Sequence, residues 1–206
     1  MLSINKSTLK NNIYYATIFI IAMAISGISH ANRTVPPGVT GIDENPLTLD
    51  KFNSVIQLGK GCRPLPETYL HSRFIHTHLR EFDGGASRLV DKSTYNKYGV
   101  GKPDAGKTEF VSTKENIDKI LRDSGGEKDK IAKRLGIPST SFSGQLVRID
   151  FRPTTKYKPK MPSGNECGAN AQWQPGGKLP DGDLEAVIET KEMQEGVDYT
   201  VSEITE

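Results

Sequence analysis

Three features of the sequence combine side chains whose chemistry could act on a phosphate-bearing substrate. Arg73 carries a guanidinium, which can bind a phosphate through two parallel hydrogen bonds. Ser112 and Thr113 supply hydroxyl groups where an expected strand gives way to an expected helix. Asp183 and Glu185 supply two carboxylates, which would share one face of a strand because strand side chains alternate. A carboxylate so placed could stabilise a positive charge that develops during a reaction.

In their order along the chain, these residues resemble the Arg…Ser-Thr-Ser…Glu-x-Glu pattern of the mono-ADP-ribosyltransferase toxins. The stretch 73–201 is also similar to the toxin domains found at the C-terminal ends of large bacterial toxin proteins. The segments that add to this similarity are Phe82–Ser87, Pro162–Glu166 and Pro175–Lys178. The resemblance covers roughly two-thirds of the chain, although each motif in it is short.

The resemblance implies that NAD is the substrate and that no metal takes part. Arg73, Ser112 and Thr113 would bind NAD. Glu185 would stabilise the oxocarbenium character that develops when the nicotinamide–ribose bond breaks. Asp183 would prepare the acceptor, an unknown macromolecule that receives the ADP-ribose. Toxins of this kind are also compatible with a separate delivery or immunity partner.

The sequence departs from the family pattern at two positions. Lys114 stands where the third residue of the Ser-Thr-Ser motif would be, and Asp183 replaces the Glu or Gln of the last motif. The second change concerns the chemistry of the acceptor. A literal Ser-Thr-Ser occurs at 139–141, but it precedes an expected strand rather than a helix and is therefore the second candidate for this motif.

Other functions are compatible with the same residues. The chain could be an NAD glycohydrolase that uses water in place of an acceptor. It could be a ribonuclease that uses His76 and His78, which would share one face of a strand expected over residues 72–78. It could also be an exported binding protein without enzymatic activity. No Asp, Glu or Cys stands at metal-ligand spacing near the two histidines, so no metal site is predicted.

The first 31 residues have the pattern of a secretory signal peptide. Lys6 and Lys10 give a positive start, and an apolar stretch follows over residues 13–25. That stretch is shorter than the ~20 apolar residues that a membrane span needs. Residues 29–31, Ser-His-Ala, form a small-x-small cleavage site. We therefore predict a secreted or periplasmic protein that begins at Asn32 and has no stable membrane association; an uncleaved membrane anchor is the alternative.

Two cysteines, Cys62 and Cys167, remain after the predicted cleavage. Export would place them in an oxidising compartment, where a disulfide can persist. An even count fits one bridge between them, and the alternative is two buried thiols.

Charge is distributed unevenly along the mature chain, which is formally neutral. Residues 51–160 hold 22 Lys or Arg and 12 Asp or Glu, whereas residues 161–206 hold 2 Lys and 10 Asp or Glu. Formal neutrality argues against a protein that coats nucleic acid, because such proteins are basic. The asymmetry favours a basic wall that binds an anionic ligand beside acidic residues that act on it.

The expected fold class is α+β, a single domain with split, mostly antiparallel sheets and a few short helices. The expected organisation is a signal peptide (1–31), an extended leader (32–66) and an ADP-ribosyltransferase-like domain (67–206). A capping box over Ser112–Glu115 marks the start of a helix with an apolar stripe. Further helices are expected over 91–98 and around Ile131 and Leu135. Besides residues 72–78, strands are expected over 109–111, 145–151, 184–190 and 197–201.

Overall fold

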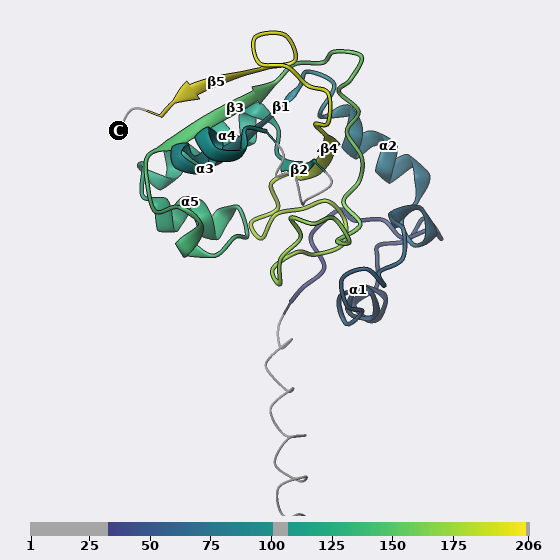
Figure 1. Cartoon of the computed structure of the whole chain (residues 1–206). Coiled ribbons are helices and arrows are strands. Elements are labelled where there is room, and N and C mark those ends of the chain that lie inside the picture. The colour runs from purple at the N-terminus through teal and green to yellow at the C-terminus, as the bar shows by residue number, and fades with distance from the viewer. Residues whose placement is uncertain (1–32, 101–106, 205–206) are drawn as a thin grey trace, which may run out of the picture. The chain divides into compact units, whose positions relative to one another are not determined.

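A computed structural model describes residues 33–100 and 107–204 (Figure 1). Residues 35–206 form one compact unit. The predicted signal peptide and its cleavage site lie outside the described residues. Among the helices of the described part, none is long and apolar enough to cross a membrane.

Two antiparallel sheets form the β part of this unit. The larger has the order β1-β3-β5, with β1 (Ala86–Asp91), β3 (Leu146–Phe151) and β5 (Tyr199–Glu203). The smaller pairs β2 (Thr108–Val111) with β4 (Ala186–Glu189). A bridge between Ser87 and Ser112 joins β1 to the residue that follows β2. The predicted α+β class with split, mostly antiparallel sheets is therefore confirmed.

Two helices cover one face of the larger sheet. In α4 (Lys114–Ser124), Ile117 and Ile120 are buried, and in α5 (Lys128–Arg134) Ile131 is buried. These isoleucines pack against Leu89 of β1 and Leu146 of β3. Leu146 pairs with Asp91, two residues from Leu89, so the two leucines lie on the same face of the sheet. The N-cap of α4 is Thr113, not Ser112, since the Thr113 hydroxyl accepts a hydrogen bond from the backbone N–H of Asn116. A glycine in the left-handed conformation, Gly125, ends the helix.

The two sheets share an apolar core. Phe151 and Ile149 of β3, Val111 of β2 and Ala186 and Ile188 of β4 are all buried in it. The helix α3 (Lys92–Tyr98) follows β1 directly and ends before Gly99, as predicted. This shared core fixes how β2 and β4 lie against β1.

The strand predicted over residues 72–78 is wrong, because this segment is the helix α2 (Ser72–Arg80). Ile75 and Leu79 are four residues apart, as on one face of a helix, and Phe74 lies next to Ile75; Phe74 and Ile75 pack against one apolar cluster and Leu79 against another. The side chain of His71 accepts a hydrogen bond from the backbone N–H of Arg73 and so caps the helix. Whether such a short segment forms a helix or a strand depends on its cap and on its packing against the rest of the protein.

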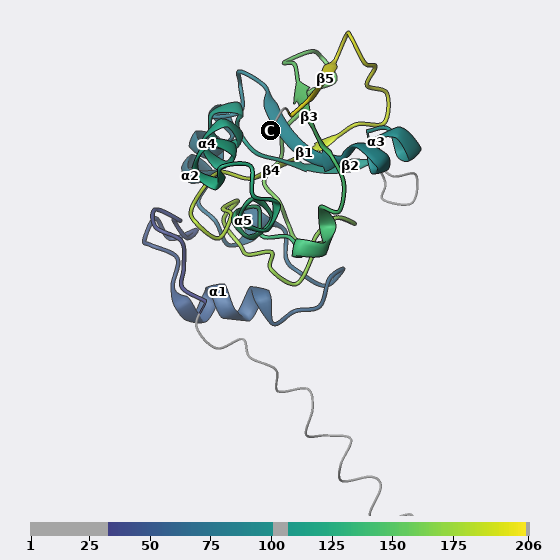
Figure 2. The same ribbon diagram turned by 90° about the vertical axis from the view of Figure 1, so that its left-hand side faces the viewer.

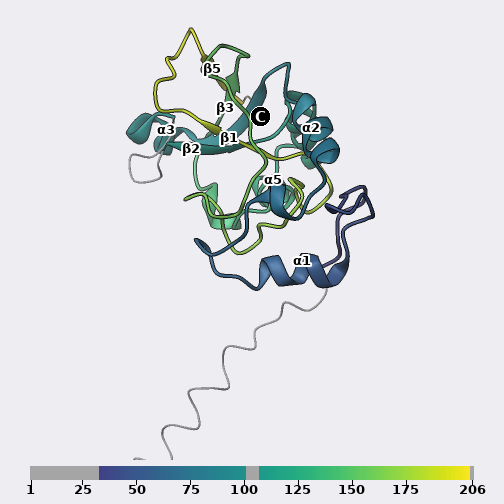
Figure 3. The same ribbon diagram turned by 90° about the vertical axis from the view of Figure 1, so that its right-hand side faces the viewer.

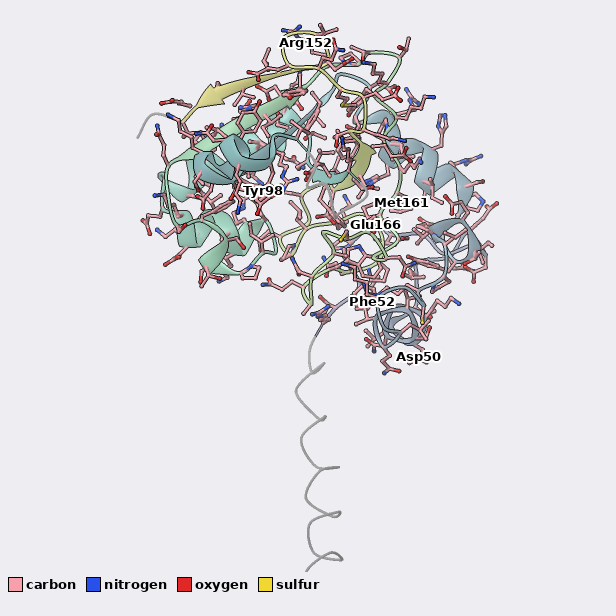
Figure 4. The ribbon with its side chains drawn as sticks, in the orientation of Figure 1. Asp50, Phe52, Tyr98, Arg152, Met161 and Glu166 are labelled. Atoms are coloured by element: carbon pink, nitrogen blue, oxygen red, sulfur yellow. The ribbon has the colours of Figure 1, made fainter. Side chains whose placement is uncertain are left out.

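The predicted leader over residues 32–66 is not an extended segment without regular structure. It contains the helix α1 (Leu49–Ile56), whose N-cap is Thr48, and it belongs to the compact unit. Phe52 on α1 is fully buried and Asp50 is exposed (Figure 4). In Figure 2 and Figure 3, α1 lies at the end of the unit opposite β5. An apolar cluster holds the segment in place: Val39, Leu47, Phe52, Val55, Ile56, Tyr69, Leu70, Met161 and Trp173.

This packing predicts that residues 35–66 contribute to global stability. We expect Phe52→Ala to lower the free energy of unfolding by about 3–4 kcal/mol, because it leaves a cavity in the core. Leu49→Ala on the same helix is the matched control, since Leu49 is 51% exposed, and it should cost less than about 1 kcal/mol. Urea unfolding of both variants measures the difference. Equal, small effects would show that the segment is a detachable leader.

Candidate functional site

A cavity of about 140 Å³ lies where the two sheets separate. Its walls come from the facing parts of β1 and β2, the turn that follows α5, and the long irregular segment between β3 and β4. The polar or charged side chains that line it are Ser87, Arg88, Glu109, Ser112, Asn170, Gln172, Lys178 and Glu185. The apolar walls include Phe110, Val111, Ile117, Leu135, Ile137, Trp173 and Leu179.

Glu185 reaches this cavity from a short hairpin that leads into β4. The backbone N–H of Leu179 donates to Asp183 O (2.8 Å), and that of Glu185 donates to Gly177 O (2.8 Å). Gly182 lies in the turn with φ = +87°, a conformation that favours glycine. The hairpin thus carries Glu185 and Lys178, both cavity residues, on its two arms.

Three neighbouring elements hold three consecutive residues of this hairpin. Arg134 of α5 pairs with the carboxylate of Asp183, with 2.6 Å between Nη2 and Oδ2. The hydroxyl of Ser112 donates to the carbonyl of Leu184 at 2.6 Å.

The third contact joins His78 of α2 to Glu185. His78 Nε2 lies 2.8 Å from the carbonyl oxygen of Glu185. The helices α5 and α2 lie on opposite sides of β4 in Figure 1. The backbone that presents Glu185 is therefore fixed from both sides.

The environment of Glu185 favours its neutral form. Burial raises the pKa of its carboxyl to about 8, and the negative charge of Glu166 adds to this rise. At neutral pH the carboxyl therefore holds its proton for most of the time. A cationic ligand in the cavity would lower this pKa and favour the carboxylate. Strongly shifted carboxyls of this kind occur preferentially at functional sites.

Arg88 is one of two basic side chains, with Lys178, that line the cavity together with Glu185. It lies on β1 and forms an ion pair with Glu109 of β2, so the pair spans the gap between the two sheets. Burial lowers the pKa of Arg88 to about 10, which still leaves it charged at neutral pH. The prediction from sequence missed Arg88 because it missed the strand β1. The available signal was the run Ala86–Asp91, which follows the Asp83-Gly-Gly turn.

The structure does not bring Arg73 to this cavity. Arg73 lies in the first turn of α2 and is exposed, and it is absent from the cavity lining. Its expected position depended on the strand at 72–78, which does not form. Arg88 is the arginine that lines this cavity together with Ser112 and Glu185.

Of the two hydroxyl residues, only Ser112 faces the cavity. Thr113 is buried and caps α4, so its hydroxyl has a structural partner in the backbone N–H of Asn116. The literal Ser-Thr-Ser at 139–141 forms a short, exposed 3-10 turn and does not line the cavity. Ser112 is therefore the hydroxyl that accompanies Glu185.

Asp183 does not share the cavity with Glu185. Its carboxylate is only 7% exposed and pairs with Arg134, which also binds Asp123 at 2.9 Å. Asp183 lies in the hairpin rather than in a strand, so its side chain serves the contact with α5.

The long segment between β3 and β4 is organised by its own polar side chains. Glu166, labelled in Figure 4, accepts hydrogen bonds from Ser163 N, Ser163 Oγ and Gly164 N at 2.8–2.9 Å. Trp173 lines the cavity, and the guanidinium of Arg63 stacks on its ring at 4.5 Å. Burial lowers the pKa of Lys178, which faces the same space. The segment supplies an aromatic and a basic wall.

The predicted Cys62–Cys167 disulfide is not formed in this structure, where both cysteines are exposed rather than buried. The chain segments that carry them nevertheless lie side by side. Asn165 Oδ1 accepts hydrogen bonds from the backbone N–H groups of Gly61 (2.8 Å) and Arg63 (3.2 Å), which flank Cys62. The bridge remains a prediction that requires the two side chains to turn toward each other.

The two histidines of the ribonuclease alternative do not form a pair. On the helix α2, His76 is exposed and His78 is buried, and neither lines the cavity. Residues two apart on a helix point in different directions, unlike residues two apart on a strand. Within residues 33–100 and 107–204, no group of three His, Cys, Asp or Glu could hold a metal ion.

A scan against protein-family models finds no match, and a search of curated proteins finds no relative.

The raised pKa of Glu185 predicts an unusual dependence of stability on pH. The folded pKa of about 8 exceeds the ordinary value of 4.5, so the folded state binds this proton more tightly. The stabilisation is complete below pH 4.5 and is lost as the pH rises through 8. Glu185→Gln should therefore become the more stable protein with rising pH, by about 2–4 kcal/mol at pH 9.

Glu189→Gln on β4 is the matched control for this measurement. The exposed Glu189 pairs with Lys160, which lowers its pKa, so its contribution is lost on the acid side. Urea unfolding of the three proteins between pH 4 and pH 9 gives the comparison. A free-energy difference between wild type and Glu185→Gln that does not change with pH would contradict the described environment of Glu185.

The neighbouring backbone contacts predict that the oxidised mature chain forms the Cys62–Cys167 bridge. Neither thiol should react with an alkylating agent in the native, oxidised protein, and both should react after reduction. A bridge that closes a loop of about 100 residues contributes about 4–5 kcal/mol in the chain-entropy description, so Cys62→Ser should lower the midpoint of unfolding. Native alkylation of both thiols without a reductant would exclude the bridge.

Proposed function

We propose that the mature chain is an exported toxin that cleaves NAD at the nicotinamide–ribose bond and transfers ADP-ribose to a macromolecular target. The observation that carries this proposal is the shared cavity of Arg88, Ser112 and Glu185. These residues follow the Arg…Ser-Thr…Glu order of the mono-ADP-ribosyltransferase toxins, with Arg88 in place of the predicted Arg73. The position of the cavity between two split sheets supports the same interpretation.

In the proposed site, Arg88 binds the pyrophosphate of NAD. A guanidinium can hold two phosphate oxygens at once, and Glu109 keeps it oriented from the neighbouring strand. The cavity of about 140 Å³ is smaller than typical sites for whole ligands, so it encloses one end of the dinucleotide. Trp173 and Lys178 are further residues that line the cavity around that end.

Glu185 acts on the ribose of the enclosed end. The nicotinamide ring of NAD is a cation, and its presence lowers the pKa of Glu185 from the value of about 8 in the free protein. The resulting carboxylate stabilises the positive charge on the ribose as the C–N bond breaks and nicotinamide leaves with the electron pair. Ser112 positions Glu185 through the carbonyl of Leu184, one residue earlier.

A specific observation favours a second candidate, an NAD glycohydrolase. Asp183, which the resemblance assigned to the acceptor, is buried against Arg134 and does not reach the cavity. Without that carboxylate, water would attack the ribose in place of a protein or nucleic-acid acceptor. Free ADP-ribose as the sole product in the presence of cell extract would favour hydrolysis over transfer.

The geometry supports the remaining alternatives less well. A ribonuclease would need His76 and His78 together, and the helix α2 separates them. A binding protein without activity does not need a half-buried carboxyl with a raised pKa in the same cavity as a half-buried guanidinium. Export through a cleaved signal peptide remains part of the proposal, as do a secreted or periplasmic location and a partner for delivery or immunity.

The direct test is nicotinamide release from NAD by the oxidised mature chain, residues 32–206. We expect Glu185→Gln to lower kcat by about 100-fold or more, because the neutral amide cannot stabilise the developing charge. Arg88→Lys keeps the charge that pairs with Glu109 but loses the bidentate hydrogen bonds to phosphate, so kcat/KM should fall about 10–100-fold. Arg73→Ala is the control and should stay within about twofold of wild type.

Two outcomes would contradict the proposal. The first is an oxidised protein that neither releases nicotinamide nor binds NAD by calorimetry. The second is loss of activity in Arg73→Ala together with retention in Arg88→Lys, which would place the phosphate grip outside the cavity. Binding without release would indicate instead that an activating partner is required.

A further inference from the structure

His78 is a buried histidine that is absent from the cavity lining yet contacts a residue that lines it. It lies on α2 between the rings of Phe74 and Phe82, with ring centroids 6.0 and 5.6 Å away. Its side chain ends 2.8 Å from the carbonyl oxygen of Glu185. The histidine and the glutamate are far apart in sequence, so this contact joins α2 to the hairpin that precedes β4.

The chemistry of this contact fixes the tautomer of His78. A carbonyl oxygen can only accept, so Nε2 must carry the hydrogen. Burial lowers the pKa of His78 to about 4, with a smaller contribution in the same direction from the charge of Lys178, even though the hydrogen bond to the carbonyl of Glu185 acts to raise it. The ring is therefore neutral at physiological pH and donates from Nε2. Neutrality also removes the cost of burying a charge beneath the hairpin.

The hairpin is shaped to let this ring approach closely. Gly177 lies opposite Glu185 and has φ = +64°. A Cβ at this position would lie 2.7 Å from His78 Nε2 and 2.6 Å from the sulfur of Met161, distances that real Cβ atoms do not show. Any other residue at 177 would force the His78 ring, the Met161 side chain or the hairpin to shift, and would also be strained at this positive φ. Glycine therefore permits the hydrogen bond between His78 and Glu185.

The carbonyl of Glu185 lies at a place where the sheet gives little support. Glu185 stands one position before β4 begins, and the β2–β4 pairing starts at Ala186 opposite Val111. Within the hairpin, the backbone N–H of Glu185 is held by Gly177 O, whereas its carbonyl oxygen is held by His78 from α2. We expect loss of the second hydrogen bond to let the peptide unit between Glu185 and Ala186 shift, and the carboxyl of Glu185 to shift with it.

We propose that His78 is a positioning residue, a neutral Nε2–H donor that fixes the backbone of Glu185 so that its carboxyl faces the cavity. His78 does not touch the substrate and acts only through Glu185. The consequence for catalysis rests on the proposed cleavage of NAD, whereas the consequence for the carboxyl of Glu185 does not.

The test compares His78→Gln with His78→Phe in the mature chain. Four bonds separate Cα from Nε2 in both histidine and glutamine, so the glutamine amide can donate from the same place. Phenylalanine keeps the ring packing and removes the donor. His76→Gln, an exposed position on the same helix, is the matched control. The two readouts are kcat and KM for NAD, and the titration of Glu185 followed by the 13C resonance of its carboxyl.

We expect His78→Phe to lower kcat about 10–100-fold with KM for NAD within about threefold, because misplacement affects the chemical step most. The pKa of Glu185 should fall from about 8 toward 4.5 as the carboxyl turns to solvent. His78→Gln should retain both properties within about fivefold in kcat. The Glu185 resonance is assigned by its loss in Glu185→Gln.

Three results would overturn the proposal. The first is a His78→Phe variant with the kcat of the wild type and an unchanged pKa of Glu185. His78→Gln and His78→Phe could lose both to the same extent, which would show a packing role only. In the wild type, the 15N spectrum could show that His78 Nε2 lacks its hydrogen and therefore cannot donate to the carbonyl of Glu185. That result would overturn the proposal even if His78→Phe fails to fold. If the wild type does not cleave NAD, the proposed function fails, while the titration and 15N results still test the positioning.

Discussion

The arrangement of the site depends on how firmly residues 183–185 are held. Asp183, Leu184 and Glu185 are bound in turn by Arg134 of α5, Ser112 after β2, and His78 of α2. These contacts are one ion pair and two hydrogen bonds, from a hydroxyl and an imidazole, and they come from three different parts of the chain. Because the hairpin lies outside the β2–β4 ladder, its position depends on these side chains. An active carboxyl has to be placed to within fractions of an ångström, and such support from neighbouring elements provides this accuracy.

The protonation state of each charged group in the cavity depends on its neighbours. Arg88 remains charged in a buried place because Glu109 pairs with it. Among the residues that the structure describes, Glu185 forms no ion pair and instead holds a proton, with the negative Glu166 opposing its ionisation. The free protein thereby avoids an unpaired buried carboxylate. A cationic ligand would supply the missing charge, which couples occupation of the cavity to ionisation of Glu185.

Part of this organisation could be predicted from sequence and part could not. The alternation over residues 145–151 and the apolar stripe after Thr113 are local patterns, and β3 and α4 form where they predict. Ser112 and Glu185, which the sequence singled out, both line the cavity, and their roles there stay predictions. The strand expected to carry Arg73 is wrong, because residues 72–78 form part of the helix α2, whose start depends on the cap at His71 and on packing against the core. Arg88 was missed because the run Ala86–Asp91 was not recognised as a strand and because its place in the cavity depends on the pairing with Glu109 of β2, which no local pattern reveals.

Trp173 is the only tryptophan in the chain and lines the cavity, so its fluorescence reports on this site alone. The most direct test of the central claim is a titration of Glu185→Gln with NAD, followed by that fluorescence, since this variant should bind without turnover. We predict saturable quenching that Arg88→Lys weakens about tenfold or more and Arg73→Ala leaves unchanged. Fluorescence that NAD does not alter, or a response that is the same in Arg88→Lys, would contradict the claim that NAD binds between Arg88 and Glu185.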